Sequence, residues 1–214
     1  MGKIKNGILG AFSGKVGNVI GATWNGVHYM RAVPVNVRDP KTPKQLAQRQ
    51  RFSLITSVTR KFKPVIDTGF QRGSGRISAI NRAVSYNIKN AITGEYPELE
   101  VDFENLSLSR GDLTGSSGIS VNSEPGGEIQ ITWNDNSGDG SARAGDTLFA
   151  ACYNKEAERL FYQPAAATRD EIECTLSLPD SFYGSDIEIW VFFVSENETD
   201  VSDSEYLGTI NVQS

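Results

Sequence analysis

The 214-residue sequence has few of the side chains that most often carry catalysis and metal binding. It has one histidine, His28, and two cysteines, Cys152 and Cys174. These cannot form a zinc site, which needs several clustered ligands. The sequence also lacks a Gly-x-Ser-x-Gly element, the turn that exposes the nucleophilic serine of α/β-hydrolases. We therefore expect that the protein is not an enzyme and has no resident cofactor. We expect His28 to be a strand residue with a polar tip.

The sequence has no apolar run long enough to span a membrane and no secretory signal. Residues 1–14 contain lysines but no clean apolar stretch and no small-residue cleavage site. We expect no membrane partner and a protein that is cytoplasmic as synthesised, with a virion as its destination if it is a phage component. In such a compartment both cysteines are expected to be buried and reduced.

Glycines are frequent at the N-terminus, with seven in the first 26 residues. The stretch 10–21, GAFSGKVGNVIG, has the look of a phosphate-binding loop. The spacing excludes that match, because Gly10 lies one residue too close to Gly14 and Lys15 is followed by Val16 rather than by Ser or Thr. Apolar β-forming residues between the glycines instead predict an extended arm, residues 1–41, that docks against another surface. The predicted interface residues are Phe12, Lys15, Val19, Ile20, Trp24, Tyr29 and Arg31.

The two halves of the sequence carry opposite charge. Residues 1–94 hold 16 Lys and Arg against Asp39 and Asp67, a net charge of +14, whereas residues 95–214 hold five against 24 Asp and Glu, a net charge of −19. Such asymmetry indicates that each half has its own partner, or that one half binds the other.

A basic helical segment is expected over residues 42–94. Thr42 and Pro43 are typical of a helix start, Pro64 should kink or end that helix, and a second helix is predicted over 77–94 with Gly94 as its C-cap. Apolar stripes at helical spacing should pack the two helices on each other; the first comprises Phe52, Ile55, Val58, Phe62, Val65 and Ile66, and the second Ile77, Ile80, Val84, Ile88 and Ile92. The predicted basic face comprises Arg49, Arg51, Arg60, Lys61, Lys63, Arg82 and Lys89.

The acidic segment 95–214 reads as β-structure throughout. Gly, Pro, Asp and Ser clusters separate seven candidate strands, which are 117–123, 128–134, 146–155, 158–163, 171–179, 187–195 and 205–212. This number of short strands in such a length is typical of an immunoglobulin-like sandwich. Trp133 and Trp190 lie in alternating strands and are predicted to be core residues. The fold class predicted for the whole chain is therefore α+β.

One acidic loop allows two interpretations. Asp135, Ser137, Asp139 and Asp146 occupy positions 1, 3, 5 and 12 of a twelve-residue calcium loop, with Gly140 at position 6. However, position 12 is Asp rather than Glu, and the predicted flanks are strands rather than helices. A glycine-rich turn between strands explains the same residues, so calcium is the only candidate cofactor and a turn is the alternative.

Several motifs resemble known proteins. G-x-F-S-G-K-V-G-N-V-I-G at 10–21, W-x-G-x-x-Y-x-R at 24–31, T-P-x-Q-L-A-Q-R-x-x-F at 42–52 and W-x-D-N-S at 133–137 resemble an uncharacterised bacterial family of about this length. That resemblance implies no catalytic residues. The C-terminal half is similar to a fibronectin type III module, and the short segment 31–45 is similar to phage and prophage structural proteins.

Three roles follow from these features. The first is a structural protein, of phage or prophage type, that forms homo-oligomers or binds other assembly proteins through its arm, with the basic half of one copy against the acidic sandwich of the next. The second is nucleic-acid binding by the basic half. The third is a protein- or glycan-binding module that uses the sandwich loops.

Overall fold

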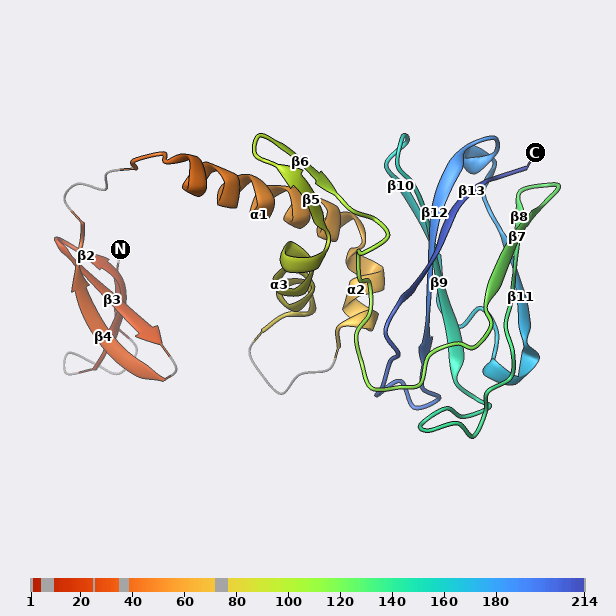
Figure 1. Cartoon of the computed structure of the whole chain (residues 1–214). Coiled ribbons are helices and arrows are strands. Elements are labelled where there is room, and N and C mark those ends of the chain that lie inside the picture. The colour runs from red at the N-terminus through yellow and green to blue at the C-terminus, as the bar shows by residue number, and fades with distance from the viewer. Residues whose placement is uncertain (1, 5–9, 25, 35–38, 72–76, 214) are drawn as a thin grey trace. The chain divides into compact units, whose positions relative to one another are not determined.

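The computed structural model describes residues 2–4, 10–24, 26–34, 39–71 and 77–213. It divides the chain into two compact units, Met1–Thr42 and Pro43–Ser214, each with its own elements (Figure 1). Among the helices of the described residues, none is long and apolar enough to cross a membrane.

The N-terminal unit is an antiparallel sheet of four strands. Its strand order is β1-β2-β3-β4, and the strands are β1 (Lys3–Ile4), β2 (Phe12–Val16), β3 (Val19–Trp24) and β4 (Val27–Ala32). The aromatic ring of Phe12 crosses Gly21 so closely that a Cβ at position 21 would lie 2.7 Å from the ring and 2.1 Å from the Phe12 carbonyl oxygen. Glycine in this segment therefore serves close packing between neighbouring strands.

Three helices begin the C-terminal unit. They are α1 (Pro43–Lys61), α2 (Lys63–Gly69) and α3 (Ala79–Asn90). As predicted, a helix begins at Pro43 and Pro64 separates two helices, because its ring lies in the first turn of α2. The Ser78 side chain caps α3 by accepting a hydrogen bond from the backbone N–H of Asn81. Two members of the predicted apolar stripes, Phe52 and Ile77, are exposed rather than buried.

The prediction that the second helix continues to Gly94 is wrong. The helix ends at Asn90, and the next residues form a hairpin of β5 (Ile92–Glu95) and β6 (Glu98–Val101). Gly94 lies in β5 with φ of 81°, where a Cβ would approach the Glu98 carbonyl oxygen to 2.2 Å. Glycine is thus required by the hairpin and not by a helix C-cap.

All seven predicted sandwich strands are present, in two antiparallel sheets. One sheet has the order β10-β9-β12-β13 and the other β11-β8-β7, which is an immunoglobulin-like sandwich of the fibronectin type III kind (Figure 1). The α+β prediction is confirmed. The strands are β7 (Ser120–Glu124), β8 (Glu128–Thr132), β9 (Thr147–Asn154), β10 (Arg159–Gln163), β11 (Glu173–Ser177), β12 (Asp186–Val194) and β13 (Glu205–Asn211).

The inner core between the two sheets contains the residues predicted from alternation. Trp133 is buried there, as are the thiols of Cys152 in β9 and Cys174 in β11, both unpaired with another cysteine. Burial raises the pKa of Cys152 to about 12 and that of Cys174 to about 11, so both stay protonated thiols.

The helices cover the outer face of the sheet β10-β9-β12-β13, which is the face that points away from the second sheet of the sandwich. Phe62, at the junction between α1 and α2, is fully buried, with its ring centroid 4.9 Å from that of Tyr153 and 5.4 Å from that of Trp190. Consequently β9 and β12 are buried on both faces. The sequence suggested separate helical and sandwich segments meeting near residue 94, whereas in the structure they share one hydrophobic core.

This shared core predicts the effect of Phe62→Ala. The substitution removes an aromatic ring from a site enclosed by both helix and sheet, so we expect the free energy of unfolding to fall by about 3–5 kcal/mol. Phe52→Ala is the matched control, because Phe52 is 56% exposed and should change it by less than about 0.5 kcal/mol. Denaturant unfolding followed by tryptophan fluorescence and helical circular dichroism measures both. Two separate transitions, with only the helical one shifted, would contradict a shared core.

Candidate functional site

The N-terminal sheet gathers most of the predicted interface residues on one face. The register pairs Lys15 with Ile20 and Ile20 with Arg31, so these three form one row across the sheet. Because side chains alternate between faces, the pairs Ala22–Tyr29 and Trp24–Val27 lie on the same side. We call this side the Trp24 face; it comprises Lys15, Ile20, Ala22, Trp24, Val27, Tyr29 and Arg31.

Two predicted interface residues lie on the opposite side. Phe12 and Val19 point to the other face of the sheet, together with His28 and Met30. The Thr23 hydroxyl and His28 Nδ1 are 2.8 Å apart across the β3–β4 pair. His28 is therefore an exposed strand residue with a polar tip, as expected.

The apolar residues of this sheet are open to solvent. Among the described residues of the N-terminal unit, none of the hydrophobic side chains is buried, and Trp24, Val27 and Met30 are 71%, 65% and 71% exposed. Trp24, Val27 and Tyr29 line an apolar hollow of about 360 Å³. The sequence prediction omitted Val27 and Met30, although the alternation of Val27 with Tyr29 and Arg31 was a signal for the first of them.

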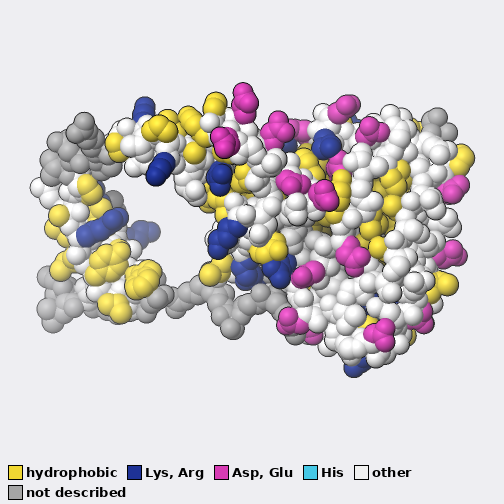
Figure 2. All heavy atoms as spheres, viewed as in Figure 1, with side chains coloured by type: hydrophobic (Ala, Val, Ile, Leu, Met, Phe, Trp, Pro, Cys, Tyr) yellow, Lys and Arg dark blue, Asp and Glu magenta, His cyan; other side chains and the backbone are white. Residues whose placement is uncertain are grey.

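The predicted basic face is partly engaged within the chain. Lys61 Nζ lies 2.8 Å from Glu158 Oε1, Lys63 pairs with Asp67, and Arg82 Nε donates to the Phe70 carbonyl at 3.0 Å. The hydrogen bond to Glu158 raises the pKa of Lys61. Exposed members of the face are Arg49, Arg51, Arg60, Lys63 and Lys89. Figure 2 shows Lys and Arg gathered over the helices and Asp and Glu over the sandwich and the β5–β6 hairpin.

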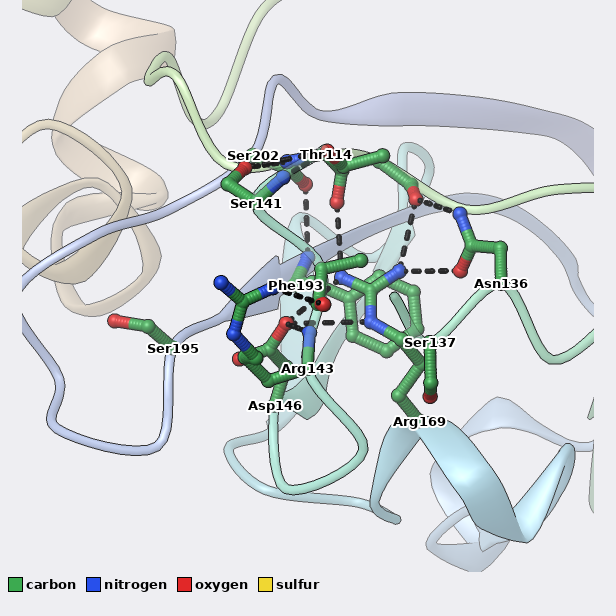
Figure 3. Close-up of polar contacts among 12 residues, drawn as sticks. Thr114, Asn136, Ser137, Ser141, Arg143, Asp146, Arg169, Phe193, Ser195 and Ser202 are labelled. Atoms are coloured by element: carbon green, nitrogen blue, oxygen red, sulfur yellow. Dashed lines mark hydrogen bonds and ion pairs between the residues drawn. The ribbon is translucent and has the colours of Figure 1, made fainter. Parts of the chain in front are cut away.

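A buried arginine organises one end of the sandwich. The fully buried guanidinium of Arg169 lies 3.2 Å from Asp146 Oδ2 and 3.8 Å from the centre of the Phe193 ring (Figure 3). Its Nη1 also donates to the Asn136 side chain at 2.6 Å and its Nη2 to the Thr114 carbonyl at 2.9 Å. Burial lowers the pKa of Arg169, an effect that Asp146 opposes. Arg169, which begins the short 3-10 helix Arg169–Glu171, was missed because no sequence motif marks a single arginine between two strands.

The residues of the candidate calcium loop 135–146 make several contacts within the chain. The Asp146 carboxylate is buried and holds the Arg169 guanidinium and the backbone N–H of Arg143. Asp135 is exposed and accepts from the backbone N–H of Ser137, as in an Asx-turn, and the Asp139 carbonyl accepts from Thr114. In the described ranges, no group of three or more His, Cys, Asp and Glu side chains could hold a metal ion. The turn interpretation fits these contacts, because the flanks β8 and β9 are strands.

A polar pocket of about 640 Å³ lies beside this loop. Side chains of both charge signs line it, Arg143 together with four acidic residues, and its serines are Ser141 and Ser195. Ser195 Oγ donates to the Asn197 side chain at 2.9 Å, and no histidine or cysteine is among the described residues that line the pocket. The lining comprises Asp112, Leu113, Ser141, Arg143, Asp146, Ser195, Glu196, Asn197 and Asp200.

The two interpretations of the loop predict different effects of substitution. Asp146→Asn leaves the Arg169 charge buried without its partner, so we expect a loss of about 3–5 kcal/mol in unfolding free energy. Asp139→Asn, at an exposed position, should cost less than about 0.5 kcal/mol. Thermal unfolding of both variants and of the unmodified chain, measured with calcium and with a chelator, tests the turn interpretation. The stability difference between each variant and the unmodified chain should be the same with and without calcium. Stabilisation by calcium that both substitutions abolish would restore the calcium interpretation.

These features define a two-unit chain: a β-sheet whose described hydrophobic side chains are all at least partly exposed, and a fibronectin type III-like sandwich whose outer face carries helices. The chain belongs to the Family of unknown function (DUF6266), whose model matches residues 11–208. No curated protein matches the chain.

Solved structures similar to this chain include fibronectin type III domains, all at low identity. The human collagen α-1(XX) domain is 14% identical, covers 47% of this chain and 86% of that chain, and has a TM-score of 0.32. The FN5 domain of Drosophila Lar is 9% identical over 46% of this chain and 95% of that chain, with a TM-score of 0.33. The chicken CNTN1 FN1–FN3 domains are 11% identical over 49% and 33%, with a TM-score of 0.35.

Proposed function

We propose that this chain is a non-enzymatic structural protein whose copies associate through the N-terminal sheet. The observation that carries the proposal is the exposure of Trp24, Val27 and Met30 in a unit whose described hydrophobic side chains are all at least partly open to water. A domain of about 40 residues rarely folds alone without a disulfide, a metal or an oligomer. The cysteines both lie in the other unit, which leaves association as the source of stability that the proposal invokes.

The charge distribution supports association between copies. The first 94 residues carry +14 and the remainder −19, so the basic half of one copy is attracted to the acidic sandwich of another. Opposite potentials raise the rate of encounter and fix orientation. A contact that does not close generates a filament or tube, and one that closes generates a ring. A phage or prophage virion is an assembly of this kind, and the likeness of segment 31–45 to such proteins supports that setting.

The alternative roles have less support. Lys61, Lys63 and Arg82 of the predicted basic face already contact groups in the same chain, which weakens the case for a phosphate-binding surface. A binding module that uses the sandwich loops would use the polar pocket near Arg143, where the mixed charge favours no single ligand class.

The test is the oligomeric state of the full chain by sedimentation at low and high salt. We expect oligomers that Trp24→Ser with Val27→Ser converts largely to monomer, because these substitutions remove two exposed apolar anchors of the interface. Ile172→Asn is the matched control: Ile172 is an apolar sandwich residue, 48% exposed, with φ of 58°, a conformation that asparagine tolerates. This variant should associate like the unmodified chain.

Salt gives a second readout of the same proposal. Assemblies held by the opposite charges of the two halves should become smaller as ionic strength rises, since salt screens exposed charges. An unmodified chain that sediments as a monomer at every salt concentration and at high protein concentration would contradict the proposal.

A further inference from the structure

The strand β4 forms an edge of the N-terminal sheet. The strand order ends at β4, and each of its six residues is exposed. The opposite edge strand, β1, has only two residues. Natural edge strands are commonly protected by proline, by lysine or by shortness. None of these protects β4, whose only charged residue is Arg31.

The register fixes which backbone groups of β4 face outward. Val33 donates to the Asn18 carbonyl at 2.8 Å, so the pair 18–33 is hydrogen-bonded. In an antiparallel ladder hydrogen-bonded and non-bonded pairs alternate. The pairs 20–31, 22–29 and 24–27 therefore bond to β3. The N–H and C=O groups of His28, Met30 and Ala32 point away from the sheet, available to another strand.

We propose that β4 pairs antiparallel with β4 of a second copy, about a two-fold axis through Met30, to join two N-terminal sheets into one. This inference rests on the proposed self-association and identifies the β4–β4 pair as the contact between the two copies. Only this register uses all three outward-facing residues, because it sets Met30 against Met30 and His28 against Ala32. A shift by two residues uses only two of them, and in one direction it also sets Arg31 against Arg31.

The side chains of this register complement each other. On the Trp24 face, Tyr29 of each copy lies directly opposite Arg31 of the other, which places a cation beside an aromatic ring twice. Val27 lies opposite Val33, so two apolar residues meet at each end of the paired strands. The joined sheet also makes the Trp24 faces of both copies continuous, and it leaves no like charges opposed in the β4–β4 pair.

A second copy is the occupant that these observations favour. Any extended peptide can add to an edge strand through backbone hydrogen bonds, but side-chain pairing selects among them. Here the side chains of β4 pair favourably with those of a second β4 that runs in the opposite direction. Such self-complementarity is the condition for an isologous two-fold contact. An extended peptide of another protein is the alternative occupant, and the following experiment separates the two.

The test is disulfide formation between two variants of the full chain, Tyr29→Cys and Arg31→Cys. Opposed residues in a non-hydrogen-bonded antiparallel pair have Cα atoms about 4.5 Å apart, within the range of a disulfide. We expect the mixture of the two variants to form a covalent dimer under mild oxidation. Each variant alone should form at least tenfold less, because its two cysteines would be diagonal neighbours about 7–8 Å apart. The native cysteines are buried and do not compete.

A second pair of variants tests the backbone contact without cysteine chemistry. Met30→Pro removes only an outward N–H, which an edge strand tolerates, whereas Met30→Ala keeps it. We expect Met30→Pro to weaken association at least tenfold in sedimentation and Met30→Ala to weaken it much less. Unchanged amide exchange in β2 and β3 shows that the sheet stays folded.

The outcomes separate the inference from the proposed function. If the unmodified chain is always monomeric, both are wrong. If it forms oligomers but the mixed variants link no better than each alone, or Met30→Pro associates normally, the β4 pairing is wrong while self-association stands. Both results as expected establish the β4–β4 contact and exclude a foreign strand as its sole occupant.

Discussion

A β-sheet with apolar side chains on both faces needs a cover for each, and this requirement organises the whole chain. In the C-terminal unit it is met twice. The inner face of the sheet β10-β9-β12-β13 packs against the second sheet, and the outer face packs against helices through Phe62. In the N-terminal unit it is not met within the described residues, where Trp24 and Met30 are mostly exposed. The same physical rule thus accounts for the buried sandwich core and is the basis for the proposal that the N-terminal sheet binds a partner.

Much of the fold could be predicted from the sequence, because local signals and tertiary packing agree there. Alternating residues such as Ile129 and Ile131 identified the strands, and Pro64 identified a helix break. The packing of helices on the sandwich was not predicted, although a signal existed. The stretches 147–154 and 186–194 are nearly continuous in apolar residues, which is typical of strands buried on both faces. The hairpin after α3 was missed because Gly94 suits both a helix end and a turn.

The residues of the candidate site could be predicted from the sequence, but their arrangement on the faces of the sheet could not. Composition alone marked Trp24 and Tyr29 as interface residues, but only the register shows that they share a face with Lys15 and Arg31. At 135–146 the spacing of the carboxylates could not show that Asp146 forms a buried ion pair with Arg169. Contacts between residues distant in the sequence decided both cases.

The most direct test of the central claim is amide hydrogen exchange of the full chain measured over a range of protein concentrations. The outward N–H groups of His28, Met30 and Ala32 have no acceptor in β3, so only another strand can protect them as strand amides. The account predicts slow exchange at these positions at high concentration and faster exchange on dilution, while the amides of Tyr29 and Arg31 remain protected. Fast exchange at His28, Met30 and Ala32 at every concentration would contradict it.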